Sequence, residues 1–234
     1  MNMGGTQMEA QNSIPVVILA GGRGSRLGDV TDVIPKPMVE VQGVPMIERI
    51  MLHFQRRGFH KFIVSAGYKQ EVIRDYFNKK NGVCVVDTGI ETQTAGRILG
   101  VESYIDTQNF FACYGDGLTD YNPQNLLTKH MQNNAICTLL TIHPTGRFGE
   151  LDFDSRGLVT RFSEKPIGDK WINGGYFCFS RNVFGYLEKN KVLETDVFSR
   201  LVAEKQLFCD SYDGFWHSLD TPKDLAELNE MELP

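Results

Sequence analysis

The stretch ILAGGRGSRL, residues 18–27, joins an apolar run to three glycines and two arginines. The run that enters it, PVVILA at residues 15–20, is continuously apolar and rich in β-branched side chains. Such a run is typical of a strand buried on both faces of a parallel sheet. Glycines after the strand let backbone N–H groups approach a phosphate closely. The stretch therefore predicts an α/β fold with a phosphate-binding loop at the carboxyl end of its first strand.

Strand-like and helix-like segments alternate beyond this stretch. We expect strands at 62–65, 83–86 and 110–114, and helices at 45–58, 70–77 and 95–104. This alternation predicts a three-layer α/β/α, Rossmann-like fold with a mixed central sheet. After residue 135, closely spaced strand-like runs predict an extension of the sheet and a small antiparallel lobe over its C-terminal edge. Further helices are expected near 182–189, 196–205 and 222–231.

Composition limits the domain organisation and the class of partner. The chain has 234 residues, of which 41% are hydrophobic and 23% charged, which suits one domain at 15–234 after a disordered lead-in at 1–14. A net charge of −5 argues against nonspecific binding to nucleic acid. No apolar stretch is as long as a membrane span and no signal peptide is evident, so we expect a cytoplasmic protein without a membrane partner.

The cysteines favour a reducing environment. There are 5 of them, widely spaced, and no C-x-x-C pair occurs. This spacing disfavours both a zinc site and a disulfide framework. We expect buried thiols.

Two common phosphate-binding patterns do not fit the glycine loop. A P-loop requires a Gly-Lys pair at its end, and no such pair follows these glycines. In the dinucleotide fingerprint G-x-G-x-x-G, counted from Gly22, the third glycine would fall on Leu27. The acidic ribose partner is also missing after the second expected strand, where the sequence is VSAG. A nicotinamide-dependent oxidoreductase is therefore disfavoured.

A third pattern fits. AGGRGSRL at 20–27, followed by PKPM at 35–38, resembles the signature of the sugar nucleotidyltransferases. The resemblance implies that Arg26 and Lys36 are catalytic, with Arg26 on the leaving phosphates and Lys36 on the transferred phosphoryl group. It also implies a set of nucleotide-binding residues: Ala20, Gly21, Gly22, Gly24, Ser25, Gly67, Tyr68, Thr94, Ala95, Gly96, Arg97 and Gly115.

Two aspartates match the metal ligands of the same family. Asp116 lies in YGDG, at the end of an expected strand, and Asp220 lies in the sequence LDTP. Two carboxylates suit a Mg²⁺ ion that bridges nucleotide phosphates. Taken alone, Asp116 could instead serve a turn and Asp220 a helix N-terminus.

Two motifs between these aspartates resemble the family's sugar-phosphate site. They are EKP at 164–166 and INGG at 172–175. The resemblance implies an acceptor-binding set in which Lys165 contacts the phosphate: Glu164, Lys165, Asn173, Gly174 and Gly175.

Further motifs resemble the branch of the family that transfers cytidylyl groups to glucose 1-phosphate. They are AGYKQEVIRDYF at 66–77, VDTG at 86–89, TAGRI at 94–98, GRFGELDF at 146–153 and GFWHSLDT at 214–221. The resemblance implies that CTP and a sugar 1-phosphate react with release of pyrophosphate, for capsule or lipopolysaccharide precursors. It further implies that Arg97 lies near the nucleotide and that Arg147 reaches phosphate or a neighbouring subunit.

The sequence leaves some alternatives for the substrates and the assembly open. Only NKKNGVCV separates the YF and VDTG elements, where the resembled enzymes carry an insertion. The acceptor could therefore be another phosphorylated small molecule, the donor another nucleoside triphosphate, and a homo-oligomer is one assembly the chain could form. A non-catalytic nucleotide-sugar-binding regulator on the same fold is disfavoured because Arg26, Lys36, Asp116 and Asp220 are all present.

Overall fold

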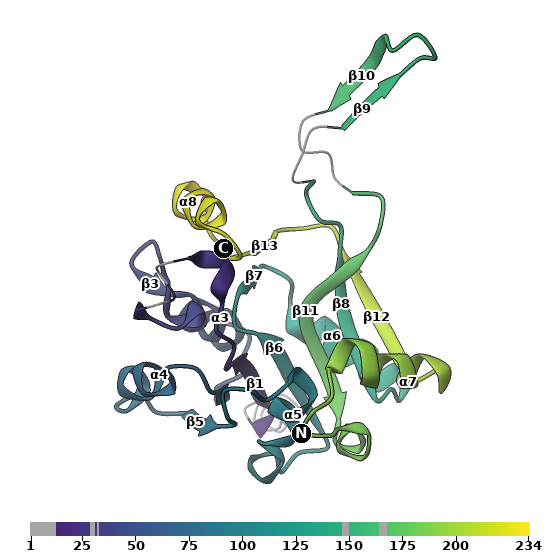
Figure 1. Ribbon diagram of the computed structural model, residues 1–234. Helices are drawn as coiled ribbons and strands as arrows, with labels where there is room; N and C mark the ends of the chain where they lie inside the picture. Colours follow the sequence, from purple (N-terminus) through teal and green to yellow (C-terminus); the bar gives the residue numbers. More distant parts are fainter. Residues whose placement is uncertain (1–12, 29–30, 32, 147–149, 164–167) are drawn as a thin grey trace, which may run out of the picture.

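The computed structural model is a three-layer α/β protein, and it describes residues 13–28, 31, 33–146, 150–163 and 168–234 (Figure 1). Its central sheet has the strand order β12-β8-β11-β6-β1-β4-β5. The strands are β1 (Pro15–Ala20), β4 (Lys61–Ala66), β5 (Val83–Asp87), β6 (Asn109–Tyr114), β8 (Cys137–Ile142), β11 (Ile172–Ser180) and β12 (Leu207–Tyr212). Only β11 runs antiparallel to its neighbours, which confirms the mixed sheet.

The first strand supplies side chains to both layers of the core. Val16 and Ile18 of β1 pack with the buried faces of α3 (Met46–Gln55) and α4 (Gln70–Phe77). Val17 and Leu19 pack with α5 (Thr94–Leu99) and α7 (Phe198–Ala203). Because successive side chains of a strand point to opposite faces, a strand covered on both sides must be apolar throughout. Residues 15–20 therefore form the expected strand, and this strand is buried on both faces as expected.

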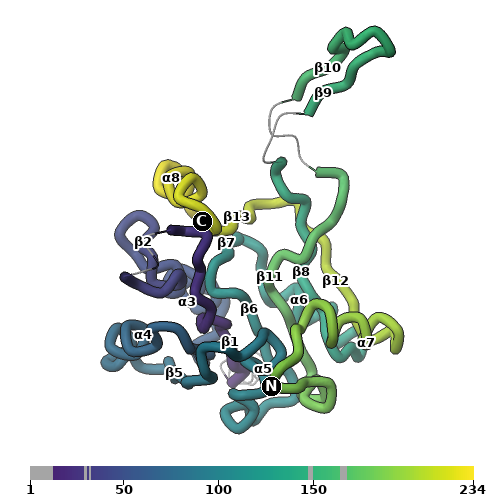
Figure 2. The backbone as a smooth tube through the Cα atoms, in the orientation of Figure 1, coloured from purple at the N-terminus to yellow at the C-terminus, as the bar shows by residue number. Residues whose placement is uncertain are grey.

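The remaining elements pack around the central sheet. Two short ribbons, β2 (Glu40–Val41) with β3 (Val44–Pro45) and β7 (Gly117–Thr119) with β13 (Trp216–Ser218), lie beside it. α8 (Pro222–Glu230) follows β13 directly, and α6 (Pro123–Asn133) leads into β8. As Figure 2 shows, β1 and β6 lie side by side although they are far apart in the sequence, and the Leu219 N–H, just before α8, donates to the Asp116 carbonyl just after the end of β6 at 2.8 Å.

Some of the expected elements differ in the structure. The helix expected at 95–104 ends at Leu99, and a 3₁₀ turn, η3 (Glu102–Tyr104), follows it. The interruption falls at Gly100, a poor helix former whose neighbour Thr88 leaves little room for a side chain. The helix expected at 182–189 is a 3₁₀ helix, η4 (Arg181–Tyr186), and the one at 196–205 is a π-helical turn, η5 (Leu193–Val197), before α7. The lead-in expected at 1–14 lies almost wholly outside the described residues.

The antiparallel lobe is a single hairpin, β9 (Glu150–Phe153) with β10 (Val159–Ser163). It lies between β8 and β11 in the sequence and projects away from the sheet instead of covering its edge (Figure 1). Within the described residues, no helix is long and apolar enough to span a membrane.

Candidate active site

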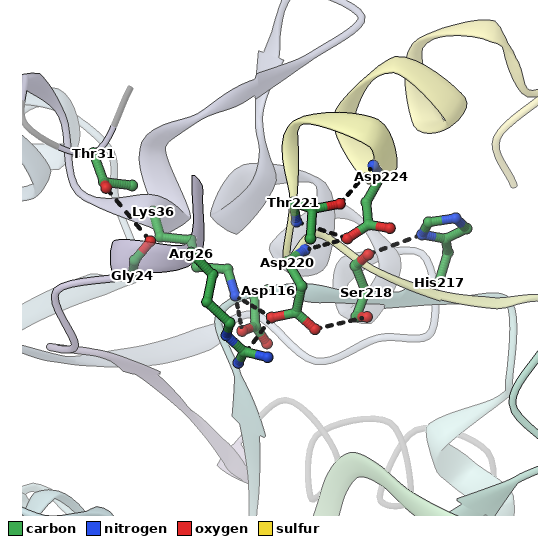
Figure 3. Close-up of polar contacts among 10 residues, drawn as sticks. All are labelled: Gly24, Arg26, Thr31, Lys36, Asp116, His217, Ser218, Asp220, Thr221 and Asp224. Carbon is green, nitrogen blue, oxygen red and sulfur yellow. Dashed lines mark hydrogen bonds and ion pairs between the residues drawn. The ribbon is translucent and has the colours of Figure 1, made fainter. Parts of the chain in front are cut away.

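Four charged side chains from separate segments meet at the carboxyl edge of the sheet (Figure 3). Lys36 Nζ lies 2.6 Å from Asp116 Oδ2 and 2.9 Å from Asp220 Oδ1. Arg26 Nη2 lies 3.0 Å from the same Asp220 oxygen. The structure therefore brings together the two cations and the two carboxylates that the sequence analysis singled out.

The backbone around each cation explains its placement. Lys36 opens a short 3₁₀ turn, η2 (Lys36–Met38), and its side chain is only 9% exposed. Proline on both sides of Lys36 restricts the backbone of this turn. Arg26 lies in another 3₁₀ turn, η1 (Ser25–Leu27), and its side chain is 69% exposed. Lys36 is thus fixed in the site, whereas Arg26 reaches over it from the rim.

Gly24 makes the close approach of the loop to Lys36 possible. Its φ angle of 66° lies in the left-handed region, and a Cβ there would come within 2.6 Å of Lys36 Cβ. Any larger residue at this position would combine backbone strain with a clash. The glycine is therefore needed for the packing of the site.

The environment of Asp220 favours its charged form. Burial alone would raise the pKa of this carboxyl, but the hydrogen bond from Lys36, the charges of Lys36 and Arg26 and the Ser218 hydroxyl outweigh burial, so the pKa lies below its usual value. The backbone N–H of Asp220 donates to Asp224 Oδ2 at 2.9 Å. Thr221 and Asp224 form a capping box at the start of α8. The alternative of a helix-terminal role for Asp220 therefore fails, because Thr221 is the N-cap residue.

A cavity of about 250 Å³ opens beside this cluster. Its lining includes ten predicted site residues: Ala20, Gly21, Gly22, Gly24, Arg26, Lys36, Thr94, Arg97, Gly115 and Asp116. Leu19, Pro37 and Tyr114 complete the lining. Eight other described residues from the predicted nucleotide and acceptor sets do not line it: Ser25, Gly67, Tyr68, Ala95, Gly96, Asn173, Gly174 and Gly175. Most of the cavity wall could thus be predicted from sequence.

Arg97 supports the glycine loop. Its guanidinium donates to the carbonyl oxygens of Gly21 at 2.9 Å, Gly89 at 3.2 Å and Ile90 at 3.1 Å, and to Thr88 Oγ1 at 3.2 Å. Burial lowers its pKa. Arg97 lines the cavity, and its donors hold the loop that leaves β1 to the loop that leaves β5.

A second polar network lies behind the cavity. The Tyr114 hydroxyl and Thr94 Oγ1 both donate to Glu194, the latter at 3.0 Å. Burial and the Glu194 carboxylate raise the pKa of Tyr114. Neither Tyr114 nor Glu194 was assigned a role from the sequence. The π-helical turn η5, which presents Glu194, has no clear sequence signal.

The predicted acceptor residues are described in part. Asn173 Oδ1 accepts a hydrogen bond from the Gly175 backbone at 2.8 Å, and the Gly174 carbonyl accepts one from Trp216 Nε1 at 2.8 Å. A Cβ on Gly175 would lie 2.7 Å from the Tyr114 ring, which places the INGG segment of β11 directly against the strand that leads to Asp116. Glu164, Lys165 and Arg147 lie outside the described residues.

The donor set suits a divalent cation such as Mg²⁺. One oxygen of Asp116 and one of Asp220 both lie within hydrogen-bond distance of the same ammonium nitrogen of Lys36. Two carboxylate oxygens that converge on one positive charge are the hard ligands that Mg²⁺ takes, usually with water and phosphate oxygens. The residues present therefore fit the ion.

Known proteins similar to this chain include relatives that it matches along nearly their whole length. A Bacillus subtilis protein described as a probable glucose-1-phosphate cytidylyltransferase is 36% identical, over 92% of this chain and 94% of its own. The glucose-1-phosphate cytidylyltransferase of Salmonella typhimurium is 35% identical, over 91% and 93%. The crystal structure of HddC from Yersinia pseudotuberculosis superposes with a TM-score of 0.72 at 25% identity, covering 93% of this chain and 98% of that one. The Nucleotidyl transferase family matches residues 15–233, so this chain is an enzyme that belongs to the nucleotidyl transferase family.

Proposed function

We propose that this enzyme transfers a cytidylyl group from CTP to a sugar 1-phosphate, such as glucose 1-phosphate, and releases pyrophosphate. The observation that carries the proposal is the cluster of Arg26, Lys36, Asp116 and Asp220 at the edge of a cavity lined by the glycine loop. The relatives named glucose-1-phosphate cytidylyltransferase support the choice of both substrates. The product would be a nucleotide sugar for capsule or lipopolysaccharide precursors.

The chemistry requires stabilisation of charge and no strong base. A phosphate monoester is already ionised near neutral pH and can attack the α-phosphorus of the nucleotide in line. Two like charges about 4 Å apart repel by roughly 1 kcal/mol in water and by several times more in a partly desolvated site. None of the described residues that line the cavity is a histidine or a cysteine. Positive charge is therefore the main contribution expected of the protein.

Each charged residue has a part in this proposal. Arg26, exposed on the rim, contacts the leaving phosphates, and the buried Lys36 contacts the transferred phosphoryl group. Asp116 and Asp220 would hold Mg²⁺, which supplies positive charge to phosphate oxygens when bound. Lys165, assigned from the sequence motif, would contact the acceptor phosphate, while Glu164 and Asn173 would form hydrogen bonds with the sugar hydroxyls.

A homo-oligomer is part of the proposal. The paired residues of the hairpin place Leu151, Phe153, Val159 and Phe162 on one face, and each side chain is 48–66% exposed. An apolar face of this kind commonly marks a contact surface. An isolated two-stranded hairpin is also marginally stable by itself.

Release of pyrophosphate tests the substrates. The experiment combines each of the four common nucleoside triphosphates with a panel of sugar 1-phosphates and other phosphorylated small molecules, in the presence of Mg²⁺. CTP with glucose 1-phosphate should give the highest kcat/KM. Another triphosphate could be preferred, since an HddC structure was determined in complex with GMP-PN. Release from no combination would contradict the proposed activity.

A further inference from the structure

We infer that His217, Asp224 and Glu227 form a binding site for a divalent transition-metal ion, separate from the proposed Mg²⁺ ligands. His217 lies on β13, and both carboxylates project from α8. One ligand atom of each residue lies within 4.8 Å of the other two. The three side chains are half-buried, and Figure 3 shows the His217 ring beside Asp224. The inference does not depend on the proposed substrates.

The histidine ring is held in an orientation suited to a metal. Its Nδ1 lies 2.9 Å from the Ser218 carbonyl oxygen. A carbonyl oxygen can only accept, so the Nδ1 of His217 carries a proton and donates it. Metal-binding histidines commonly donate one ring N–H to a backbone carbonyl in this way, which leaves the other nitrogen for the metal. Nε2 is therefore the ligand atom.

Nε2 faces a carboxylate. It lies 3.5 Å from Glu227 Oε2, in a contact where the side chains of His217 and Glu227 are 18% and 30% exposed. In the neutral ring, Nε2 is an acceptor, and an acceptor pointed at a carboxylate oxygen is repelled unless a proton or a cation lies between them. The nearby Asp224 carboxylate adds a second negative charge, and a divalent cation would balance both.

The ligand set favours particular ions. One imidazole nitrogen with two carboxylates suits Mn²⁺, Co²⁺ or Zn²⁺ better than Mg²⁺ or Ca²⁺, which prefer oxygen ligands alone. Three protein ligands would leave the other coordination positions of the ion to water molecules. The site thus differs in chemistry from the all-oxygen pair of Asp116 and Asp220.

The site adjoins the start of α8. Asp224 Oδ2 accepts hydrogen bonds from the backbone N–H groups of Asp220 at 2.9 Å and Thr221 at 2.7 Å. A cation on Asp224 and His217 would join β13 to the first turn of α8, where Asp220 is placed. We therefore expect a structural ion that raises the stability of this segment.

Titration calorimetry with Co²⁺ tests the inference on the untagged full-length protein, with excess Mg²⁺ present to occupy oxygen-only sites. We expect a single equivalent of Co²⁺ to bind, and His217→Ala to abolish this binding. Glu227→Gln keeps the size of the side chain and should weaken binding by about tenfold or more. His143→Ala is the matched control, because His143 also contacts a carboxylate, that of Asp213, outside the proposed site. This control should bind Co²⁺ as the wild type does.

Two further measurements distinguish Co²⁺ binding at this site from Co²⁺ binding by other residues. The Co²⁺ complex should lack the strong thiolate charge-transfer absorption that the exposed Cys209 would give. Added Co²⁺ should raise the Tm of the wild type and of His143→Ala but not that of His217→Ala. No Co²⁺ binding, or equal binding by wild type and both site variants, would overturn the inference and leave His217 and Glu227 as a proton-mediated ion pair.

Discussion

Arg97 shows how a residue at the active-site wall can serve the fold. Its motif predicts a place near the nucleotide, and in the structure it lines the cavity. Its bonds to the carbonyls of Gly21, Gly89 and Ile90 could not be inferred from its motif, because they depend on how two loops from different strands meet. The same limit applies to Glu194, whose contact with Tyr114 joins residues 80 positions apart.

Replacement of Arg97 tests its supporting role. In Arg97→Ala, three carbonyl oxygens would lose their donor, and we expect the free energy of unfolding to fall by about 2–4 kcal/mol. Arg97→Lys should lose less, since an ammonium can restore part of the bonding but cannot reproduce the planar fork. Urea denaturation measures both variants. The control, Arg156→Ala, removes an exposed ion pair with Asp154 and should change stability by less than about 0.5 kcal/mol. Equal stability of Arg97→Ala and the control would contradict the supporting role.

Elements with a strong periodic pattern were predicted well, and those with a weak pattern were not. β1 and α4 have the bounds expected from the sequence. α6 and β12 were not predicted, since α6 is rich in polar residues and the side chains of β12 alternate between half-buried and exposed at the sheet edge. The hairpin strands were recognised, but their pairing with each other and not with the central sheet could not be inferred from their sequence pattern.

The hairpin leads to a prediction about assembly. Phe153 and Phe162 are 66% and 63% exposed on its apolar face. If this face joins copies of the chain, Phe153→Ser with Phe162→Ser should shift sedimentation velocity profiles toward the monomer. Arg161→Ser, on the opposite face of the same hairpin, is the control and should sediment as the wild type does. A wild type that stays monomeric at all concentrations would exclude the homo-oligomer.

At the scale of the whole molecule, buried histidines couple stability to pH. Burial lowers the pKa of both His53 and His130 to about 4. Because an unfolded histidine has a pKa of about 6.5, the unfolded state binds more protons between these values, and stability falls as the pH drops from 6.5 to 4. The lowered pKa of Asp220 causes a further loss of stability only below about pH 4, where an unfolded aspartate becomes protonated.

The variant His130→Gln isolates one of these contributions. Glutamine can keep a hydrogen bond to Thr138 Oγ1, which lies 3.1 Å from His130 Nδ1, but it cannot titrate. We expect urea denaturation between pH 6.5 and pH 4 to show roughly half the wild-type loss of stability, since one of two similar histidines remains. His60→Gln alters an exposed histidine and should retain the full loss. An unchanged pH slope in His130→Gln would contradict this explanation.

The three-layer fold and the order of its motifs follow from sequence patterns, whereas the meeting of Lys36 with Asp116 and Asp220 requires the folded chain.

The most direct test of the proposed activity is pyrophosphate release from CTP and glucose 1-phosphate by the wild type, Lys36→Ala and Lys129→Ala. Lys129 also pairs with an aspartate, Asp210, but does not line the cavity. We predict that Lys36→Ala folds and loses at least about a hundredfold in kcat/KM, a loss typical of removing one transition-state charge contact. Lys129→Ala should match the wild type. An unchanged kcat/KM in Lys36→Ala would contradict the central claim.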